Sequence, residues 1–395
     1  MSNHFSKISG WGMYVPDRVL TNHELAAMVD TTDEWIIART GIRERHIAAD
    51  NETTVDMGVI AAQRALESAG ITAADVDLIL LATSTPNQLC PPASSLLQHR
   101  LGASKAGAMT LVAGCSGFAY ALITAAQFVS TGVYRHILVV GSEKISFAID
   151  WTDRNTNILF GDGAGAVVVS QSDQPGGLLS MVLGSDGSQA DALIVPGIGS
   201  ATTLTPEALE RKEHKLRMDG QRVFKFATRV MTDAVLKVVA DAGMTLHDID
   251  LVIPHQANER IIDLAMRRLG IGRDKVMINV DRYGNTSAAS IPLALCEALE
   301  SGRIQPGGRL VLVAFGAGLT YAACVWEWQT AEVQDEPILV TDWPVSETFQ
   351  QRLQEMRVAA FRAQTQARVA VADATMAVMI PFYTFRRGVK KRLGK

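Results

Sequence analysis

Up to about residue 328, short apolar runs alternate with longer amphipathic runs. The run 59–67 has apolar residues at helical spacing and precedes the apolar stretch Leu78-Ile-Leu-Leu, and the run 230–240 precedes Leu251-Val-Ile in the same way. Short apolar stretches predict buried strands, and longer amphipathic runs predict helices. Because the two alternate, the pattern predicts an α/β fold with largely parallel sheets covered by helices.

The same pattern recurs 173 residues further along the chain. The segment Ser68-Ala-Gly-Ile-Thr-Ala-Ala-Asp-Val-Asp resembles Asp241-Ala-Gly-Met-Thr-Leu-His-Asp-Ile-Asp, and His136-Ile-Leu-Val-Val-Gly resembles Arg309-Leu-Val-Leu-Val-Ala. Two matches at one interval indicate an internal duplication. We therefore expect two similar halves, at 1–172 and 173–328, that form one layered body.

Cys115 lies where an apolar run, predicted as a buried strand, gives way to an Ala-rich helical run. A thiol at a helix N-terminus faces unpaired N–H groups, which favour the thiolate and therefore a nucleophile near neutral pH. Cysteine is also a common small residue of hydrophobic cores. The residues around Cys115 leave both interpretations open, because a nucleophile needs partners.

Two candidate partners, His255 and Asn285, lie in the second half. His255 follows the apolar run 249–253 and Asn285 the run 276–280, each predicted as a strand, and a helical run comes after each. A single histidine is more often structural, but a Cys, a His and an Asn at strand-to-helix turns favour catalysis. If the duplicated halves pack about a pseudo-two-fold axis, equivalent strand ends meet and bring the three together.

Composition narrows the class of protein. The 395 residues are 48% hydrophobic and 20% charged, which is typical of a folded globular chain, and the net charge of −4 gives no signal for nucleic acid. The four cysteines lack the spacing of a disulfide framework or a zinc site. The N-terminus lacks the apolar core of a signal peptide and no apolar run is long enough to span a membrane, so we expect a cytoplasmic protein.

Three other segments bear on whether the chain binds a ligand. Trp35 and Arg39 lie in an Arg-rich stretch that suits an adenine ring and phosphates, although the stretch taken alone favours a solvated, ion-paired connection. The glycines of 161–165 lead into a Val-rich run instead of opening a helix, which excludes a dinucleotide fingerprint and favours close backbone packing. The turn at 315–318 has N–H groups that could stabilise an oxyanion.

The chain changes character from residue 329 onward. Residues 335–344 have the composition of a linker, 346–377 predict one or two helices, and the last ten residues carry six basic and no acidic side chains. We therefore expect a helical, basic C-terminal extension at 329–395. The basic tail at 380–395 fits either a peripheral contact with a membrane or an acidic partner, or a helix packed on the body with a solvated end.

Seven motifs together resemble β-ketoacyl-acyl-carrier-protein synthase III, a family of the thiolase superfamily. The resemblance spans about residues 8–328 and leaves the extension outside. The motifs, in chain order, are Thr32-Asp-Glu-Trp-Ile, Arg39-Thr-Gly-Ile-Arg-Glu-Arg, Ala113-Gly-Cys-Ser-Gly-Phe, Phe160-Gly-Asp-Gly-Ala-Gly-Ala, Pro254-His-Gln-Ala-Asn, Tyr283-Gly-Asn-Thr-Ser-Ala-Ala-Ser and Ala314-Phe-Gly-Ala-Gly-Leu-Thr.

The resemblance implies a five-layered αβαβα body, a homodimer and an acyltransferase without a cofactor or metal. Acyl-CoA and malonyl-acyl carrier protein are its implied substrates, which it condenses with loss of carbon dioxide at the start of fatty acid, specialised lipid or polyketide synthesis. The implied residues are Cys115, His255 and Asn285 for catalysis, the N–H groups of Cys115 and Ala317 for the oxyanion, Trp35, Arg39, Arg154 and Asn258 for coenzyme A, and Gln256 and Arg260 for the carrier protein.

One departure from the family concerns the acyl pocket. Where acetyl-using relatives have a bulky aromatic residue, this chain has Cys90, which predicts an acyl primer longer than acetyl unless Leu89 or a partner-chain residue refills the space. Two other functions remain open. The acyl-cysteine could pass its acyl group to another nucleophile or condense it without decarboxylation, or the protein could act as a scaffold recruited by its basic tail.

Overall fold

The computed structural model describes residues 4–202 and 204–329, which belong to a compact unit at Met1–Ala331. The predicted extension at 329–395, with its basic tail at 380–395, lies outside the described residues apart from Gln329. Among the described helices, none is long and apolar enough to cross a membrane.

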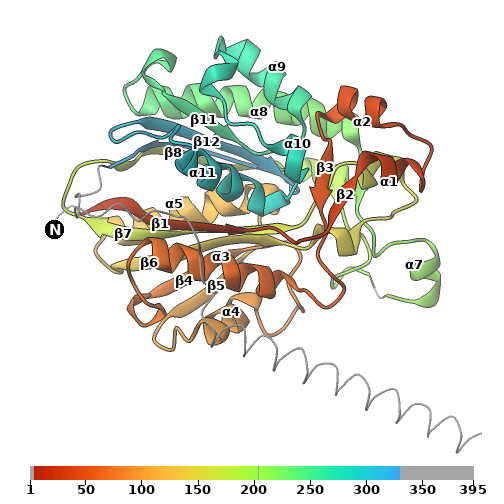
Figure 1. Ribbon diagram of the computed structural model, residues 1–395, viewed down its shortest axis with the longest axis horizontal. Coiled ribbons are helices and arrows are strands. Elements are labelled where there is room, and N and C mark those ends of the chain that lie inside the picture. The colour runs from red at the N-terminus through yellow and green to blue at the C-terminus, as the bar shows by residue number, and fades with distance from the viewer. Residues whose placement is uncertain (1–3, 203, 330–395) are drawn as a thin grey trace, which may run out of the picture. The chain divides into compact units, whose positions relative to one another are not determined.

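Two mixed sheets form the centre of this unit (Figure 1). The five-stranded sheet has the order β1 (Phe5–Tyr14), β7 (Gly163–Ser172), β6 (His136–Glu143), β4 (Leu78–Ala82) and β5 (Gly107–Leu111). The four-stranded sheet has the order β11 (Leu251–Pro254), β12 (Arg309–Gly316), β13 (Thr320–Glu327) and β8 (Gly177–Ser185). All strands of the first sheet lie within 1–172, and all strands of the second lie within 173–328.

Helices separate and cover the two sheets, so that the layers run helix, sheet, helix, sheet, helix (Figure 1). Helices α5 (Gly117–Ser130) and α11 (Ser290–Glu300) lie between the sheets in one apolar core shared by both halves. Helices α3 (Thr54–Ser68) and α4 (Ala93–Leu101) cover the first sheet, and α8 (Gly220–Asp241) and α9 (Glu259–Leu269) cover the second. The predicted α/β fold is confirmed.

Shorter elements surround the ends of the sheets. Strands β2 (Val19–Thr21) and β3 (Glu44–His46) pair with each other, as do β9 (Leu193–Ile194) and β10 (Arg217–Met218). The remaining α-helices are α1 (Asn22–Ala26), α2 (Asp33–Thr40), α6 (Arg154–Asn157), α7 (Pro206–Glu210) and α10 (Val280–Tyr283), and short 3-10 turns include η1 (Ala73–Asp75), η2 (Gly114–Ser116), η5 (Leu246–Asp248) and η7 (Ser287–Ala289).

The two copies of the 173-residue repeat have the same local structure. In the first, the Asp75 carboxylate accepts hydrogen bonds from the Thr72 N–H (2.9 Å) and hydroxyl (2.7 Å). In the second, the Asp248 carboxylate accepts the equivalent bonds from Thr245 at 2.8 and 2.7 Å. Each aspartate completes the capping box of the 3-10 turn, η1 or η5, that leads from a long helix into a strand, β4 or β11.

Two predicted strands differ from the structure. The run before Cys115 forms β5, which is an edge strand with a single neighbour, and its Met109 side chain is exposed where a buried strand was expected. The run 276–280 does not form a strand: Val276 makes one isolated bridge to Val252, and α10 begins at Val280. Apolar content identified both segments as parts of the body, but it carries no information about where a sheet ends.

Candidate active site

Cys115 lies in η2, directly before α5, and is buried. Gly114 has φ +55°, and a Cβ there would lie 2.6 Å from the backbone nitrogen of Ala317. A Cβ on Gly316 would in turn lie 2.4 Å from the nitrogen of Cys115. Glycine at both positions therefore lets the β12–β13 turn of the second half approach the cysteine turn of the first. This packing brings Ala317 beside the cysteine turn, as the oxyanion hypothesis requires.

His255 follows β11 and is fixed from two sides. Its backbone N–H donates to Val313 O at 2.8 Å, and its ring packs edge-on against Phe315 with centroids 5.1 Å apart. Burial lowers the pKa of His255 to about 3, so the ring is neutral at physiological pH. Its Nε2 atom is buried and has no hydrogen-bond partner among the described residues. A buried ring nitrogen without a hydrogen-bond partner destabilises the folded protein unless a ligand supplies that partner.

The other ring nitrogen of His255 indicates which tautomer is present. Nδ1 lies 2.5 Å from the Ser290 hydroxyl oxygen, and the N–H of Gln256 donates to that oxygen at 3.4 Å. When the Ser290 hydroxyl donates to Nδ1, the proton of the neutral His255 ring is on Nε2. In that tautomer the unpartnered Nε2 atom is a hydrogen-bond donor.

Asn285 joins the two halves through its backbone and is also buried. Its N–H donates to Leu159 O at 2.8 Å, and its carbonyl accepts from Gly161 N–H at 3.1 Å. Its side-chain Oδ1 accepts from the Ser287 N–H at 2.9 Å. This bond fixes the orientation of the amide, so that Nδ2 is the group left to donate to a substrate.

The segment 285–290 connects the three predicted catalytic residues. Asn285 begins it, the Ser287 N–H donates to Asn285 Oδ1, and the Ser290 hydroxyl contacts His255. The turn η7 in this segment packs against η2, which carries the cysteine. Sequence reasoning missed Ser287 and Ser290 as functional residues, although both lie within the Asn285 motif.

Burial raises the pKa of Cys115 to about 12, and the nearby charge of Glu143 adds to this shift. The expectation of a thiolate in the free enzyme at neutral pH is therefore wrong. The helix N-terminus does lie beside the sulfur, but the closed site removes the water that a bare thiolate needs. Cys115 is a thiol at rest and must lose its proton during the encounter with a thioester.

Alkylation of Cys115 by iodoacetamide is expected to accelerate about tenfold per pH unit between pH 7 and 9, because the thiolate fraction rises tenfold per unit below the pKa. The measurement is the mass of the Cys115 peptide over time, in a Cys90→Ser background that removes the exposed thiol. A rate that levels off near pH 7 would contradict the high pKa of the resting thiol.

The residues proposed for coenzyme A gather beside α2. The Trp35 ring contacts two guanidinium groups, with Arg39 Cζ 5.3 Å and Arg154 Cζ 4.8 Å from its centroid. Arg154 also donates to Asp30 O at 2.6 Å, so part of this cluster is tied into the fold. Asn258 caps α9, accepting from Arg260 N–H at 2.9 Å, and donates to Arg39 O at 3.1 Å. Its side chain thus joins α9 to α2.

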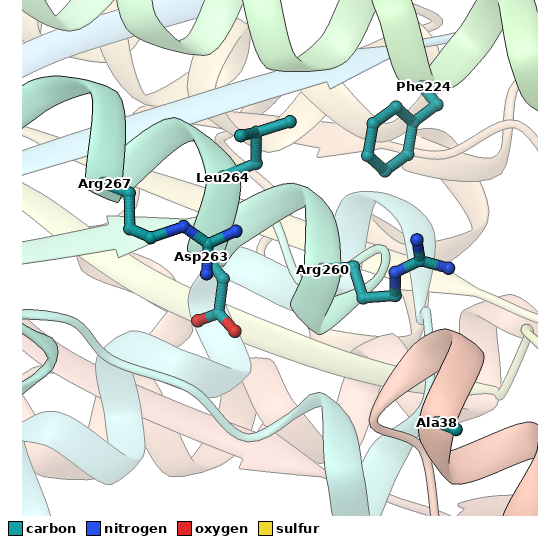
Figure 2. A pocket seen from close by; sticks show the side chains of 6 residues that line it. All are labelled: Ala38, Phe224, Arg260, Asp263, Leu264 and Arg267. Carbon is teal, nitrogen blue, oxygen red and sulfur yellow. The ribbon is translucent and has the colours of Figure 1, made fainter.

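The two residues proposed to contact the carrier protein lie in different surroundings. Arg260 is exposed at the start of α9 and lines a pocket between α2, α8 and α9 (Figure 2). Gln256 is only 1% exposed, and its amide bonds Pro254 O, Met277 O and the N–H groups of Asn279 and Val280. A partner protein cannot reach Gln256, so that prediction is wrong and the residue is a structural crosslink.

Cys90 lies on the loop between β4 and α4 and is exposed, next to Leu89, which is 80% exposed. The single chain therefore leaves the predicted acyl-pocket residue at the surface.

Comparisons with known proteins identify the family of this chain. Residues 109–187 match the family model for 3-oxoacyl-[acyl-carrier-protein] synthase III, and 239–328 match its C-terminal model. The β-ketoacyl-[acyl-carrier-protein] synthase III of Desulfitobacterium hafniense strain Y51 is 49% identical over 321 residues, which are 81% of this chain and 97% of the relative.

Solved structures give the same result. The synthase III of Thermus thermophilus superposes with a TM-score of 0.77 at 47% identity, covering 82% of this chain and all of that one. The priming β-ketosynthase of the R1128 polyketide pathway has a TM-score of 0.77 at 41% identity, covering 83% of this chain and 97% of that one. Since sequence identity and fold agree over 81–82% of its length, the chain belongs to the β-ketoacyl-[acyl-carrier-protein] synthase III family.

Proposed function

We propose that this enzyme joins an acyl group from coenzyme A to the two-carbon unit that malonyl-acyl carrier protein yields on losing carbon dioxide. The product is a β-ketoacyl-carrier protein. The observation that carries the proposal is the buried, unpartnered Nε2 of neutral His255, which is linked through Ser290 to the segment that begins with Asn285 and packs against the Cys115 turn. Such a donor is suited to an oxygen that becomes negatively charged during the reaction.

In the first half-reaction, Cys115 Sγ attacks the thioester carbonyl of acyl-CoA. The negative charge that develops on the carbonyl oxygen is stabilised by the backbone N–H groups of Cys115 and Ala317, which the glycine contacts of the two turns bring together. The carbon–sulfur bond to coenzyme A breaks, and the departing thiolate takes up one proton. One proton is thus lost by the Cys115 thiol and one is gained by coenzyme A. The acyl group is then held as a thioester on Cys115.

In the second half-reaction, malonyl-carrier protein occupies the site that coenzyme A has left. Its carboxylate leaves as carbon dioxide, and the electron pair of the broken bond moves onto the thioester carbonyl as an enolate. His255 Nε2–H and Asn285 Nδ2–H donate to that oxygen, each contributing about 3 kcal/mol. The enolate carbon attacks the acyl carbonyl, the new carbon–carbon bond forms and the carbon–sulfur bond to Cys115 breaks, and the released Cys115 thiolate takes up one proton from solvent to restore the resting thiol.

Substrate entry is proposed beside α2 and α9. The Trp35 ring with Arg39 and Arg154 suits an adenine ring and phosphates, since guanidinium groups bind phosphate oxygens in a planar, bidentate manner. Arg260 and Arg267 project from α9 at the pocket of Figure 2, where positive charge suits the phosphopantetheine arm and an acidic carrier-protein surface.

A homodimer would cover the exposed edge of the first sheet. Among the described strands β5 pairs with β4 alone; Val112, which follows β5, is 70% exposed, and Leu89, on the loop between β4 and α4, is 80% exposed. A free edge flanked by large apolar side chains is a surface that a second strand covers. Pairing of β5 with its copy in a second chain would bury these residues together with Cys90, which would then close an acyl pocket.

The wild-type enzyme is expected to load octanoyl-CoA in preference to acetyl-CoA, and Cys90→Phe is expected to reverse this preference by about tenfold or more, because a phenyl ring fills the space that the longer chain needs. The measurement is the rate of acyl-Cys115 formation with each donor. Cys90→Ser is the matched control and should keep the octanoyl preference. A clear acetyl preference in the wild type would refute the longer-primer assignment.

The alternative function transfers the acyl group to another nucleophile or condenses it without decarboxylation. Incubation with acyl-CoA and malonyl-carrier protein separates the two, since decarboxylative condensation releases one carbon dioxide per β-ketoacyl product. Acyl transfer without carbon dioxide would favour the alternative. The basic composition of 380–395 supports an additional peripheral contact, which a chain ending at residue 345 would test by comparing turnover with binding to anionic vesicles.

A further inference from the structure

A buried carboxylate lies close to the proposed site, and its charge has so far entered only as one cause of the raised pKa of Cys115. Glu143 ends β6 and is fully buried. Its oxygens accept hydrogen bonds from the Thr85 hydroxyl at 2.6 Å, the Thr83 hydroxyl at 3.1 Å and the Ser84 N–H at 3.1 Å. A fourth bond, from the Ser287 hydroxyl at 2.9 Å, comes from the other half of the chain.

The three bonds from residues 83–85 fix Glu143 firmly in the first half. The Thr83 hydroxyl oxygen accepts from Thr85 N–H at 3.0 Å, and the Thr85 hydroxyl oxygen accepts from Lys144 N–H at 2.9 Å. Each hydroxyl hydrogen is therefore available to donate to Glu143. Burial raises the pKa of Glu143, and these donors oppose that shift. A carboxyl group held in this way is a rigid anchor for the fourth donor.

That donor, Ser287, has an unusual backbone. Its φ is +52°, in the left-handed region that residues with a Cβ rarely adopt. In this conformation its N–H donates to Asn285 Oδ1 while its hydroxyl donates to Glu143 Oε1. If the residue relaxed to negative φ, the N–H would turn away and the Asn285 amide would lose the bond that orients it.

We propose that Glu143 is a positioning residue for Asn285. Through the Ser287 hydroxyl it holds the left-handed turn whose N–H orients the Asn285 carboxamide, and Nδ2–H is thereby directed at the enolate oxygen of the malonyl group. The inference rests on the proposed function, because it assigns Asn285 to decarboxylation. It goes beyond that function because it makes the orientation of the Asn285 carboxamide depend on Glu143, which does not contact the substrate.

Two substitutions at Ser287 separate its hydroxyl from its backbone conformation. Ser287→Ala removes the hydroxyl and keeps a Cβ, so the left-handed turn loses its support, and carbon dioxide release from malonyl-carrier protein by the octanoyl-loaded enzyme is expected to fall about tenfold or more. Ser287→Gly also removes the hydroxyl, but glycine adopts positive φ without strain, and its rate is expected to stay within about threefold of wild type.

Glu143→Gln is expected to slow carbon dioxide release as Ser287→Ala does, because the amide replaces one acceptor oxygen with a donor. In the Ser287→Gly background the same substitution is expected to cost nothing further, since the link to Asn285 is already absent. The final extent of acyl loading on Cys115, measured by mass for every variant, should match the wild type, which a general loss of structure would not allow; the loading rate is not used, because the Glu143 charge also acts on the thiol.

The results discriminate clearly. Equal losses in Ser287→Gly and Ser287→Ala would overturn the proposal and assign a direct role to the hydroxyl. Wild-type rates in Ser287→Ala or in Glu143→Gln would overturn it as well, as would a loss of acyl loading that matches the loss of carbon dioxide release. A wild-type enzyme that releases no carbon dioxide from malonyl-carrier protein would instead refute the proposed function, independently of Glu143.

Discussion

The His255→Ala variant is expected to acylate Cys115 at close to the wild-type rate and to lose decarboxylative condensation by about 100- to 1000-fold. The reason is that Nε2–H of a neutral, buried imidazole acts only on the enolate oxygen of the second half-reaction. Acyl-Cys115 is measured by mass after incubation with acyl-CoA. Carbon dioxide is measured after malonyl-carrier protein is added.

The exposed His247, on η5, provides the control: His247→Ala should leave both steps unchanged. If His255→Ala instead lost acyl loading to the same degree as carbon dioxide release, His255 would be the base that takes the thiol proton, and its assignment as an enolate donor would be wrong.

Cys115→Ala is expected to eliminate the acyl adduct and to lower condensation by at least about 10³-fold, because no other group in the site can hold the acyl chain. His255 and Asn285 remain in this variant, so malonyl-carrier protein should still lose carbon dioxide without an acyl acceptor. A variant that cannot be acylated but still decarboxylates malonyl-carrier protein is expected only if the reaction has these two separate steps.

Cys324→Ala is the matched control for Cys115→Ala, because Cys324 is a second buried thiol on β13 within the apolar core. It should keep the full acyl adduct on Cys115. An adduct of undiminished yield in Cys115→Ala would show that another residue is the nucleophile.

Much of the fold could be predicted from the sequence because the duplication repeats a pattern with a strong physical signal. The capped turns at Asp75 and Asp248 come from the same short-range chemistry, and the glycines at 161–165 lead into β7 as their Val-rich continuation indicated. The edge position of β5 could not be predicted, since strand order depends on contacts between distant segments.

The candidate site was accessible from sequence only in part. The residue types Cys115, His255 and Asn285 stand out at strand ends, but the environment of each depends on tertiary packing. Closure around the sulfur raises its pKa, which a helix N-terminus alone would lower. Gln256 is buried because the segment 277–280 lies against it. Its amide therefore hydrogen-bonds that segment, and the residue is not available to a partner protein.

Glu143 and Ser287 were beyond sequence reasoning for a different reason. An acidic residue at the end of an apolar run ordinarily indicates that the strand has reached solvent, yet Glu143 is enclosed by donors from 83–85 and from Ser287. The positive φ of Ser287 leaves no trace in residue type, because serine rarely adopts it.

The most direct test of the account is a single-turnover experiment on the wild-type enzyme. The chain is first incubated with octanoyl-CoA, freed of excess donor, and analysed by intact mass and by the mass of the Cys115 peptide. Malonyl-carrier protein is then added. We predict one octanoyl group on Cys115, which disappears as one carbon dioxide and one β-ketodecanoyl-carrier protein form per acyl group. An acyl group on another residue, or one that leaves Cys115 without carbon dioxide, would contradict the account.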